Sequence, residues 1–95
     1  MLKNLVDIGN LITSSPEIQH GSPIIAGTGT SVKRIVALYK QGYSPDEIKA
    51  DKEYLTLAQI YAALAYYYTN QQAIEEELAQ DALDYERLSA QVLTN

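Results

Sequence analysis

Two stretches decide the fold of this chain, Ser44-Pro45-Asp46-Glu47 and Thr56-Leu57-Ala58-Gln59. Each has a hydroxyl residue followed three positions later by Glu or Gln. This is the pattern of a capping box, in which both side chains bind backbone N–H groups at the start of a helix. Apolar residues that can form a hydrophobic staple flank each start; the pairs are Tyr43 with Ile48 and Leu55 with Ile60. Two helix starts twelve residues apart predict a short helix, a tight connection and a longer helix, which is the outline of a helix-turn-helix.

The composition is that of one small globular domain. The chain has 95 residues, of which 46% are hydrophobic, so it can bury a core of its own. It contains no Cys, which excludes disulfides and thiolate chemistry and is typical of a reducing cytoplasm. No apolar run has the length of a signal peptide or of a bilayer span, which needs roughly 20 apolar residues. We therefore expect a cytoplasmic protein that does not enter a membrane.

The net charge of −5 is concentrated near the C-terminus. Residues 1–65 contain six basic and six acidic side chains, whereas residues 66–95 contain six acidic side chains and a single base, Arg87. Strong non-specific binding to nucleic acid requires clustered Lys and Arg, which this pattern lacks. The acidic tail indicates either a protein partner or a role in solubility alone.

The residues before Ser44 predict a short β segment followed by a helix. The first dozen residues are expected to form a short arm, and two apolar runs, 12–14 and 23–26, can pair as a hairpin. From Thr30 onward, apolar residues recur at helical spacing, at Val32, Ile35, Val36 and Tyr39. Thr30 or Ser31 is expected to cap this helix, and Gly42 stands where a left-handed cap residue ends one.

The longer helix, predicted over residues 57–69, carries two apolar stripes. One stripe consists of Leu57, Ile60, Tyr61, Leu64 and Tyr68, and the other of Ala58, Ala62, Ala63, Tyr66 and Tyr67. Because successive helical residues turn by about 100°, the three adjacent tyrosines cannot share one face. We expect the second stripe to pack against the last helix or against another copy of the chain, with Tyr66 and Tyr67 as partner-binding residues.

A last helix is predicted from Gln71 to about Ala90, with Asn70 as its cap. Its apolar residues recur at helical spacing, at Ile74, Leu78, Ala82, Tyr85, Leu88 and Val92, and acidic residues fill the other positions. Such an amphipathic stripe must pack against something. It either folds back on the domain or pairs with another chain, and Leu78, Tyr85 and Arg87 are its candidate partner-binding residues.

The expected fold is therefore mainly α, with a short N-terminal β segment, a three-helix, helix-turn-helix core and a C-terminal amphipathic helix. Residues 1–69 form the β arm and the helix-turn-helix domain, and residues 70–95 form the acidic helical tail.

No pattern in the chain indicates catalysis, a metal or a cofactor. His20 is the only histidine and has no partner at a useful spacing. The stretch 27–31 lacks the third Gly of a dinucleotide fingerprint and the Gly-Lys of a P-loop. The adjacent acids Glu75, Glu76 and Glu77 fan around a helix and are expected to form a solvated face. We therefore expect a protein that is not an enzyme.

The helix-turn-helix has a small set of candidate contacts to double-stranded DNA. Residues early in a recognition helix face base edges. Gln59 is of the type that pairs with adenine, and Thr56 can bond a phosphate. Lys33 and Arg34 on the preceding helix can bind the DNA backbone. A helix-turn-helix can equally serve only as a scaffold.

Three segments in order carry a resemblance to a known family: Gly21-Ser22-Pro23-Ile24-Ile25-Ala26-Gly27-Thr28, Gly42-Tyr43-Ser44-Pro45-Asp46-Glu47-Ile48 and Tyr54-Leu55-Thr56-Leu57-Ala58-Gln59-Ile60-Tyr61-Ala62-Ala63-Leu64. They resemble the bacterial family called domain of unknown function 433. The resemblance implies a homeodomain-like three-helix core after a short β segment. It also implies a VapB-like antitoxin, with a dimeric DNA-binding half and a C-terminal tail that occupies a PIN-like ribonuclease toxin. Arg87 is then the candidate to enter the toxin's acidic site.

The chain departs from the family pattern after Gly27-Thr28. The family usually has Arg at the next position and Pro two positions later, where this chain has Gly29 and Ser31. If that Arg binds phosphate in relatives, this chain lacks the contact.

Two hypotheses follow. The first is an antitoxin-like, non-enzymatic homodimer that binds DNA and, through its tail, a PIN-like toxin. The alternative is a homo-oligomeric adaptor or structural module that binds no DNA.

Overall fold

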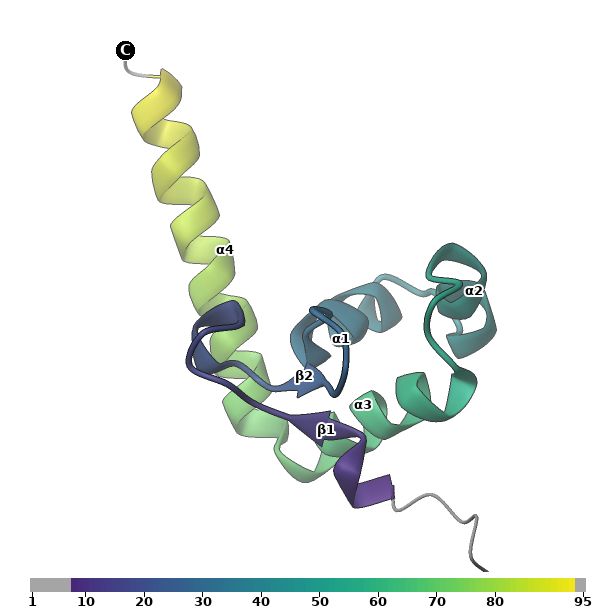
Figure 1. Cartoon of the computed structure of the whole chain (residues 1–95). Coiled ribbons are helices and arrows are strands. Elements are labelled where there is room, and N and C mark those ends of the chain that lie inside the picture. The colour runs from purple at the N-terminus through teal and green to yellow at the C-terminus, as the bar shows by residue number, and fades with distance from the viewer. Residues whose placement is uncertain (1–7, 94–95) are drawn as a thin grey trace, which may run out of the picture.

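The computed structural model of the chain describes residues 8–93 and confirms a mainly helical fold (Figure 1). The side chains of residues 91–93, Val92 among them, are not described. Of the predicted arm, residues 1–7 lie outside the described residues, and the next three form the short 3-10 helix η1. The elements are η1 (Ile8–Asn10), β1 (Ile12–Thr13), η2 (Gln19–Gly21), β2 (Ile24–Ile25), α1 (Val32–Lys40), α2 (Pro45–Asp51), α3 (Leu57–Thr69) and α4 (Gln71–Leu93).

The two strands pair antiparallel, as predicted, with Ile12 opposite Ile25 and Thr13 opposite Ile24. Each strand is only two residues long, and residues 26–31 connect β2 to α1. The Ile25 N–H group donates to the Thr30 carbonyl at 2.9 Å, and the Val32 N–H group donates to the Pro23 carbonyl at 2.8 Å. These bonds hold the start of α1 beside the hairpin.

Both predicted capping boxes are confirmed. The Ser44 N–H group donates to Glu47 Oε1 at 2.9 Å, and the Glu47 N–H group donates to Ser44 Oγ at 3.2 Å. In the second box, the Thr56 N–H group donates to Gln59 Oε1 at 2.8 Å, and the Gln59 N–H group donates to Thr56 Oγ1 at 3.1 Å. The bond from Ser44 also lowers the pKa of the Glu47 carboxyl. The helices α2 and α3 therefore begin one residue after their predicted caps.

Residues at its own two ends also determine where α1 begins and ends. Of the two candidate caps, Ser31 is the one used: its Oγ accepts a hydrogen bond from the Arg34 N–H group at 3.2 Å. After α1, Gly42 has a φ of 105°, which a side chain would strain.

The core lies between α1 and α3, with side chains from β2, the loop before α3 and the start of α4 closing it. Its fully buried members include Ile25, Val32, Ile35, Val36, Ile48, Leu55, Ile60 and Ile74. α3 contributes Ile60, Ala63, Leu64 and Tyr67, which is neither of the two predicted stripes.

The division of α3 into those two stripes is therefore wrong. Tyr61 and Tyr68 of the first stripe are 54% and 56% exposed, whereas Tyr67 of the second is 5% exposed. A helix that is apolar on most of its circumference does not by itself select one face. The elements packed around α3 make the selection.

α4 lies against the domain only at its beginning. Ile74 is 1% exposed, and Leu78 packs against the core. Asp81 pairs with Lys33 of α1, and beyond it the helix runs away from the other helices toward the C-terminus (Figure 1). It extends past the predicted end near Ala90 to Leu93. Asn70 stands at the predicted cap position of α4, where its carbonyl accepts a hydrogen bond from the Ile74 N–H group at 3.1 Å, while its side chain donates to the Tyr66 carbonyl at 3.1 Å and closes the end of α3.

Removing a cap hydroxyl should destabilise the domain. We expect Ser44→Ala and Thr56→Ala each to lower the free energy of unfolding by about 1 kcal/mol, because a backbone N–H group loses its acceptor. Urea denaturation followed by circular dichroism measures this. Ser14→Ala is the matched control, because Ser14 is exposed outside any helix or strand, and it should change the value by less than about 0.5 kcal/mol. Equal effects of all three variants would contradict the capping role.

Candidate functional site

Thr56 and Gln59 come together in the structure, but as partners of one another. The Gln59 side-chain oxygen is held by the Thr56 N–H group, and the Thr56 hydroxyl oxygen is held by the Gln59 N–H group. Recognition of adenine by Gln uses both the oxygen and the nitrogen of the amide. Base reading by Gln59 therefore competes with the cap of α3.

Lys33 and Arg34, predicted to bind the DNA backbone together, have different surroundings. Lys33 Nζ lies 2.8 Å from Asp81 Oδ2 of α4, in an ion pair. The exposed Arg34 side chain forms no ion pair within the described part of the chain. As neighbours on a helix, the two point about 100° apart. Arg34 is therefore the one that remains available to an anion.

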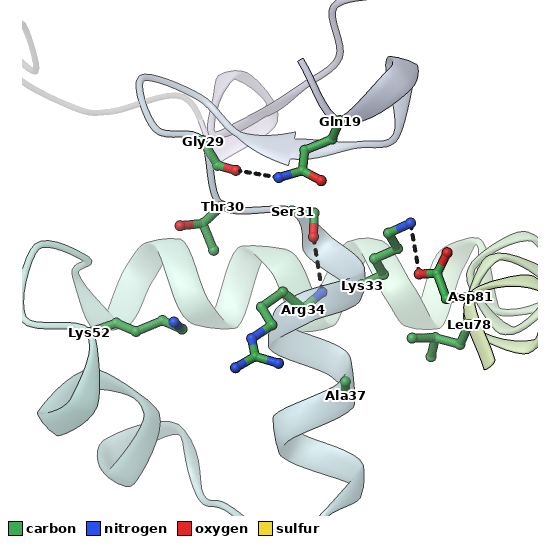
Figure 2. A pocket seen from close by; sticks show the side chains of 10 residues that line it. All are labelled: Gln19, Gly29, Thr30, Ser31, Lys33, Arg34, Ala37, Lys52, Leu78 and Asp81. Carbon is green, nitrogen blue, oxygen red and sulfur yellow. Dashed lines mark hydrogen bonds and ion pairs between the residues drawn. The ribbon is translucent and has the colours of Figure 1, made fainter. Parts of the chain in front are cut away.

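A pocket of about 500 Å³ lies in front of Arg34 (Figure 2). Its wall combines the start of α1 with the α2–α3 connection, η2 and α4, and its charged lining residues are Lys33, Arg34, Lys52 and Asp81. Lys52 was not singled out from the sequence, where it is only part of a polar connection. No local pattern places it opposite Arg34, since the two meet only when α2 folds against α1.

Glu75 links three helices. Its carboxylate oxygens lie 2.6 and 2.8 Å from Lys40 Nζ of α1, and the Tyr67 hydroxyl of α3 donates a hydrogen bond to it. The Lys40 and Tyr67 bonds lower the pKa of the Glu75 carboxyl, and Glu75 raises the pKa of both Lys40 and Tyr67. This cluster attaches the start of α4 to the domain.

The sequence predicted that the acids 75–77 form a solvated face, and this prediction is wrong for Glu75 and Glu77. Besides the bonds of Glu75, Glu77 Oε1 accepts a hydrogen bond of 2.6 Å from Ser22 Oγ. Because successive residues of α4 turn by about 100°, Glu75 and Glu77 flank the side that faces the domain, whereas Glu76 points to the opposite side. Only Glu75 and Glu77 therefore bond α1, α3 and the loop before β2.

The five predicted partner-binding residues separate into two groups. Tyr67 is buried in the chain's own core, and Tyr66 and Leu78 are partly buried against it, so these three side chains pack within the chain, which is one of the two alternatives predicted for them. They are covered because α4 and the N-terminal segment pack on α3. By contrast, Tyr85 is 74% exposed, and the Arg87 side chain is 66% exposed and lies 3.7 Å from Asp84.

We define the projecting part of α4 as residues 82–90. Besides Tyr85 and Arg87, it exposes Leu83 and Leu88, at 54% and 61%. Leu88 belongs to the predicted apolar stripe of this helix, and that spacing is the signal that identifies it. Leu83 lies outside the stripe.

The described part of the chain has neither a metal site of grouped side chains nor a membrane-spanning helix. Within it, no group of three His, Cys, Asp or Glu side chains is placed to hold a metal ion. None of the described helices is both long and apolar enough to cross a bilayer.

Comparison with known proteins gives a family and a fold. The family model described as "Protein of unknown function (DUF433)" matches residues 12–67, from β1 into α3. The crystal structure of a DUF433 member protein from Anabaena variabilis ATCC 29413 is similar to this chain, with a TM-score of 0.70 and 33% sequence identity. The similarity covers 74% of this chain and 69% of that chain. No curated protein matches.

The Glu75 cluster predicts a specific dependence of stability on pH. A carboxyl with a lowered folded-state pKa stabilises the fold above its unfolded pKa of about 4.3, and this stabilisation is lost as the pH falls through the folded value. Glu75→Gln should therefore lower the Tm at pH 7, and the difference from the wild type should disappear in acid. Thermal denaturation at both pH values measures it.

Glu76→Gln is the matched control, because Glu76 is exposed on the outer side of the same turn and bonds only Gln72. It should leave the Tm at pH 7 nearly unchanged. A Glu75→Gln effect that persists unchanged in acid would contradict a stabilising role for the carboxylate charge.

Proposed function

The chain belongs to the DUF433 family, and from this premise we propose that it is an antitoxin-like, non-enzymatic binding protein. In this proposal it acts as a cytoplasmic homodimer, its helix-turn-helix domain contacts double-stranded DNA, and its acidic tail helix binds a PIN-like toxin.

The observation that carries the proposal is the projecting part of α4. The whole helix is about 35 Å long at 1.5 Å per residue, yet only its first turns pack against the domain. Isolated helices shorter than about 12 residues are marginal in water. A projecting helix with exposed Tyr85 and Leu88 therefore supports a function in which a partner covers this surface.

Arg87 supports a nuclease as that partner. PIN-type active sites gather carboxylates around a metal, and most of the tail would be repelled there. Arg87 is the tail's only base, and its loose contact with Asp84 leaves it free to form a bidentate pair with a carboxylate. The proposed toxin contact therefore depends on Arg87 for charge and on Tyr85 and Leu88 for apolar area.

The DNA-binding half is supported by the three-helix core and by the unpaired Arg34. The same core favours a second candidate, a homo-oligomeric adaptor that binds no DNA. Its support is specific: Thr56 and Gln59 bond each other, and residues 1–65 have no excess of positive charge.

Titration of labelled DNA separates the two candidates. We expect the protein to bind the promoter of its own gene more tightly than a random-sequence duplex, with affinity falling as salt rises, because counterions are released from each neutralised phosphate. Fluorescence anisotropy at two salt concentrations measures this. Equal affinity for both duplexes would favour the adaptor.

The same titration with the Gln59→Glu variant tests whether Gln59 reads a base. Its carboxylate oxygen can still close the capping box, but it lacks the amide donor that adenine recognition requires. We expect the ratio of promoter to random-sequence affinity to fall by about tenfold. An unchanged ratio would exclude Gln59 as a base-reading residue.

Co-purification from the native host tests the tail. We expect a small nuclease to accompany the wild-type protein, and its affinity to fall by about 30-fold in Tyr85→Ala or Leu88→Ala, which is the scale of an interface hot spot. Tyr61→Ala is the matched control, because it removes a 54% exposed tyrosine from α3, outside the tail, and should leave binding unchanged. Purification without any nuclease would contradict the proposal.

A further inference from the structure

We infer that the pocket between α1 and the α2–α3 connection binds a phosphate group, with Arg34 and Lys52 as its cationic ligands. This inference rests on the proposed function as far as DNA supplies the phosphate, and it deepens that function by naming where the backbone is held. Free phosphate has the same chemistry, so the experiment below separates the two sources.

The two cations enter the pocket from different elements. Arg34 extends from the first turn of α1, and Lys52 extends from the residue that ends α2 (Figure 2). Figure 2 shows their charged ends directed into the same opening, below Thr30. Two like charges at one opening repel each other. An anion between them would turn this repulsion into two favourable interactions.

Lys52 is poorly neutralised by the protein. Its side chain is only 17% exposed, and its single ion pair, with Asp51, is long at 3.9 Å. Removing a cation from water without a close counter-charge is costly. A bound oxyanion would compensate both Lys52 and Arg34, and Arg presents paired donors that match phosphate oxygens.

The other carboxylates around the pocket have partners already. Asp81, on the α4 side, pairs with Lys33. A second pocket on the far side of Arg34 is lined by Glu47 and Asp51. Glu47 is bound in the Ser44 capping box, and the Asp51 side chain is 74% exposed. Among the described residues, Arg34 therefore has no carboxylate within ion-pair distance, and the lining of the pocket has a net positive charge.

Polar groups around the opening complete the wall. The Thr30 hydroxyl is hydrogen-bonded to Tyr54 of the α2–α3 connection, which fixes the two loops relative to each other. Gln19 Nε2 donates to the Gly29 carbonyl at 3.1 Å, which closes the upper rim (Figure 2). The positive end of the α1 dipole adds to the field of the two cations. The arrangement is preorganised by contacts that do not use the Arg34 or Lys52 side chains.

Asp81 makes the site dependent on the tail helix. Because Asp81 neutralises Lys33 at the edge of the same pocket, its removal would leave a third cation for the anion. Asp81→Asn is therefore expected to tighten phosphate binding, whereas loss of Arg34 or Lys52 is expected to weaken it.

The test follows backbone amide resonances of the full chain by NMR during titration with inorganic phosphate, against chloride at equal ionic strength and pH. We expect wild-type shifts at Thr30–Arg34, and binding about tenfold weaker in Arg34→Gln and in Lys52→Gln, because each loses a charged hydrogen bond. Arg87→Gln is the matched control. It removes the same charge from an exposed site on α4 and should bind phosphate as the wild type does.

A second arm uses the promoter duplex. If DNA supplies the phosphate, Arg34→Gln should reduce the slope of log affinity against log salt by about 0.9, and Arg87→Gln should not. DNA binding unaffected by Arg34 and Lys52, with no phosphate shifts, would overturn the inference and leave the proposed function standing. Phosphate shifts that require both residues without any DNA binding would support the pocket and contradict the proposed DNA contact. Absence of both kinds of binding would overturn both.

Discussion

The arrangement of the other elements depends on the packing around α3, whose start is set by the reciprocal bonds between Thr56 and Gln59. α3 contacts α1, α2, α4 and both strands. The residue at which α3 begins therefore determines which of its side chains face these elements. The same bonds have a functional consequence. A side-chain amide that closes a helix start is less available to a base, so the two residues predicted to contact DNA are also those that hold the start of α3.

Some charged side chains form ion pairs that attach the tail to the domain, and others have no close partner among the described residues. The acidic tail is attached to the domain by Glu75 with Lys40 and by Asp81 with Lys33, which joins α4 to α1 at two points. Tyr67 adds a hydrogen bond from α3 to the first of these. Among the described residues, Arg34 has no ion pair and Lys52 has only a 3.9 Å contact with Asp51, and Arg87 lies on the projecting part of α4. The neutral sum over residues 1–65 therefore conceals a local excess of positive charge.

Helix starts, the β hairpin and the left-handed Gly42 could be predicted from the sequence, because each depends on residues a few positions apart. The candidate binding residues were predicted less well. Tyr85 and Arg87 are exposed as expected, but Tyr67 is buried and Lys33 is paired with Asp81. Lys52 was missed, because its role depends on a neighbour that is close in space and distant in sequence. Such pairings have no periodic or spacing signal.

By itself, the sequence determined where α1, α2 and α3 begin and that α1 ends before Gly42, since a cap hydroxyl or a glycine acts on the backbone of its own turn. It also determined that the last helix is acidic and amphipathic. Only the tertiary structure decided which side of α3 is buried, which tail acids are bound and which cations stay free. Those outcomes depend on where α1, α2 and α4 lie around α3, because burial and ion pairing require side chains from separate elements to meet within a few ångströms.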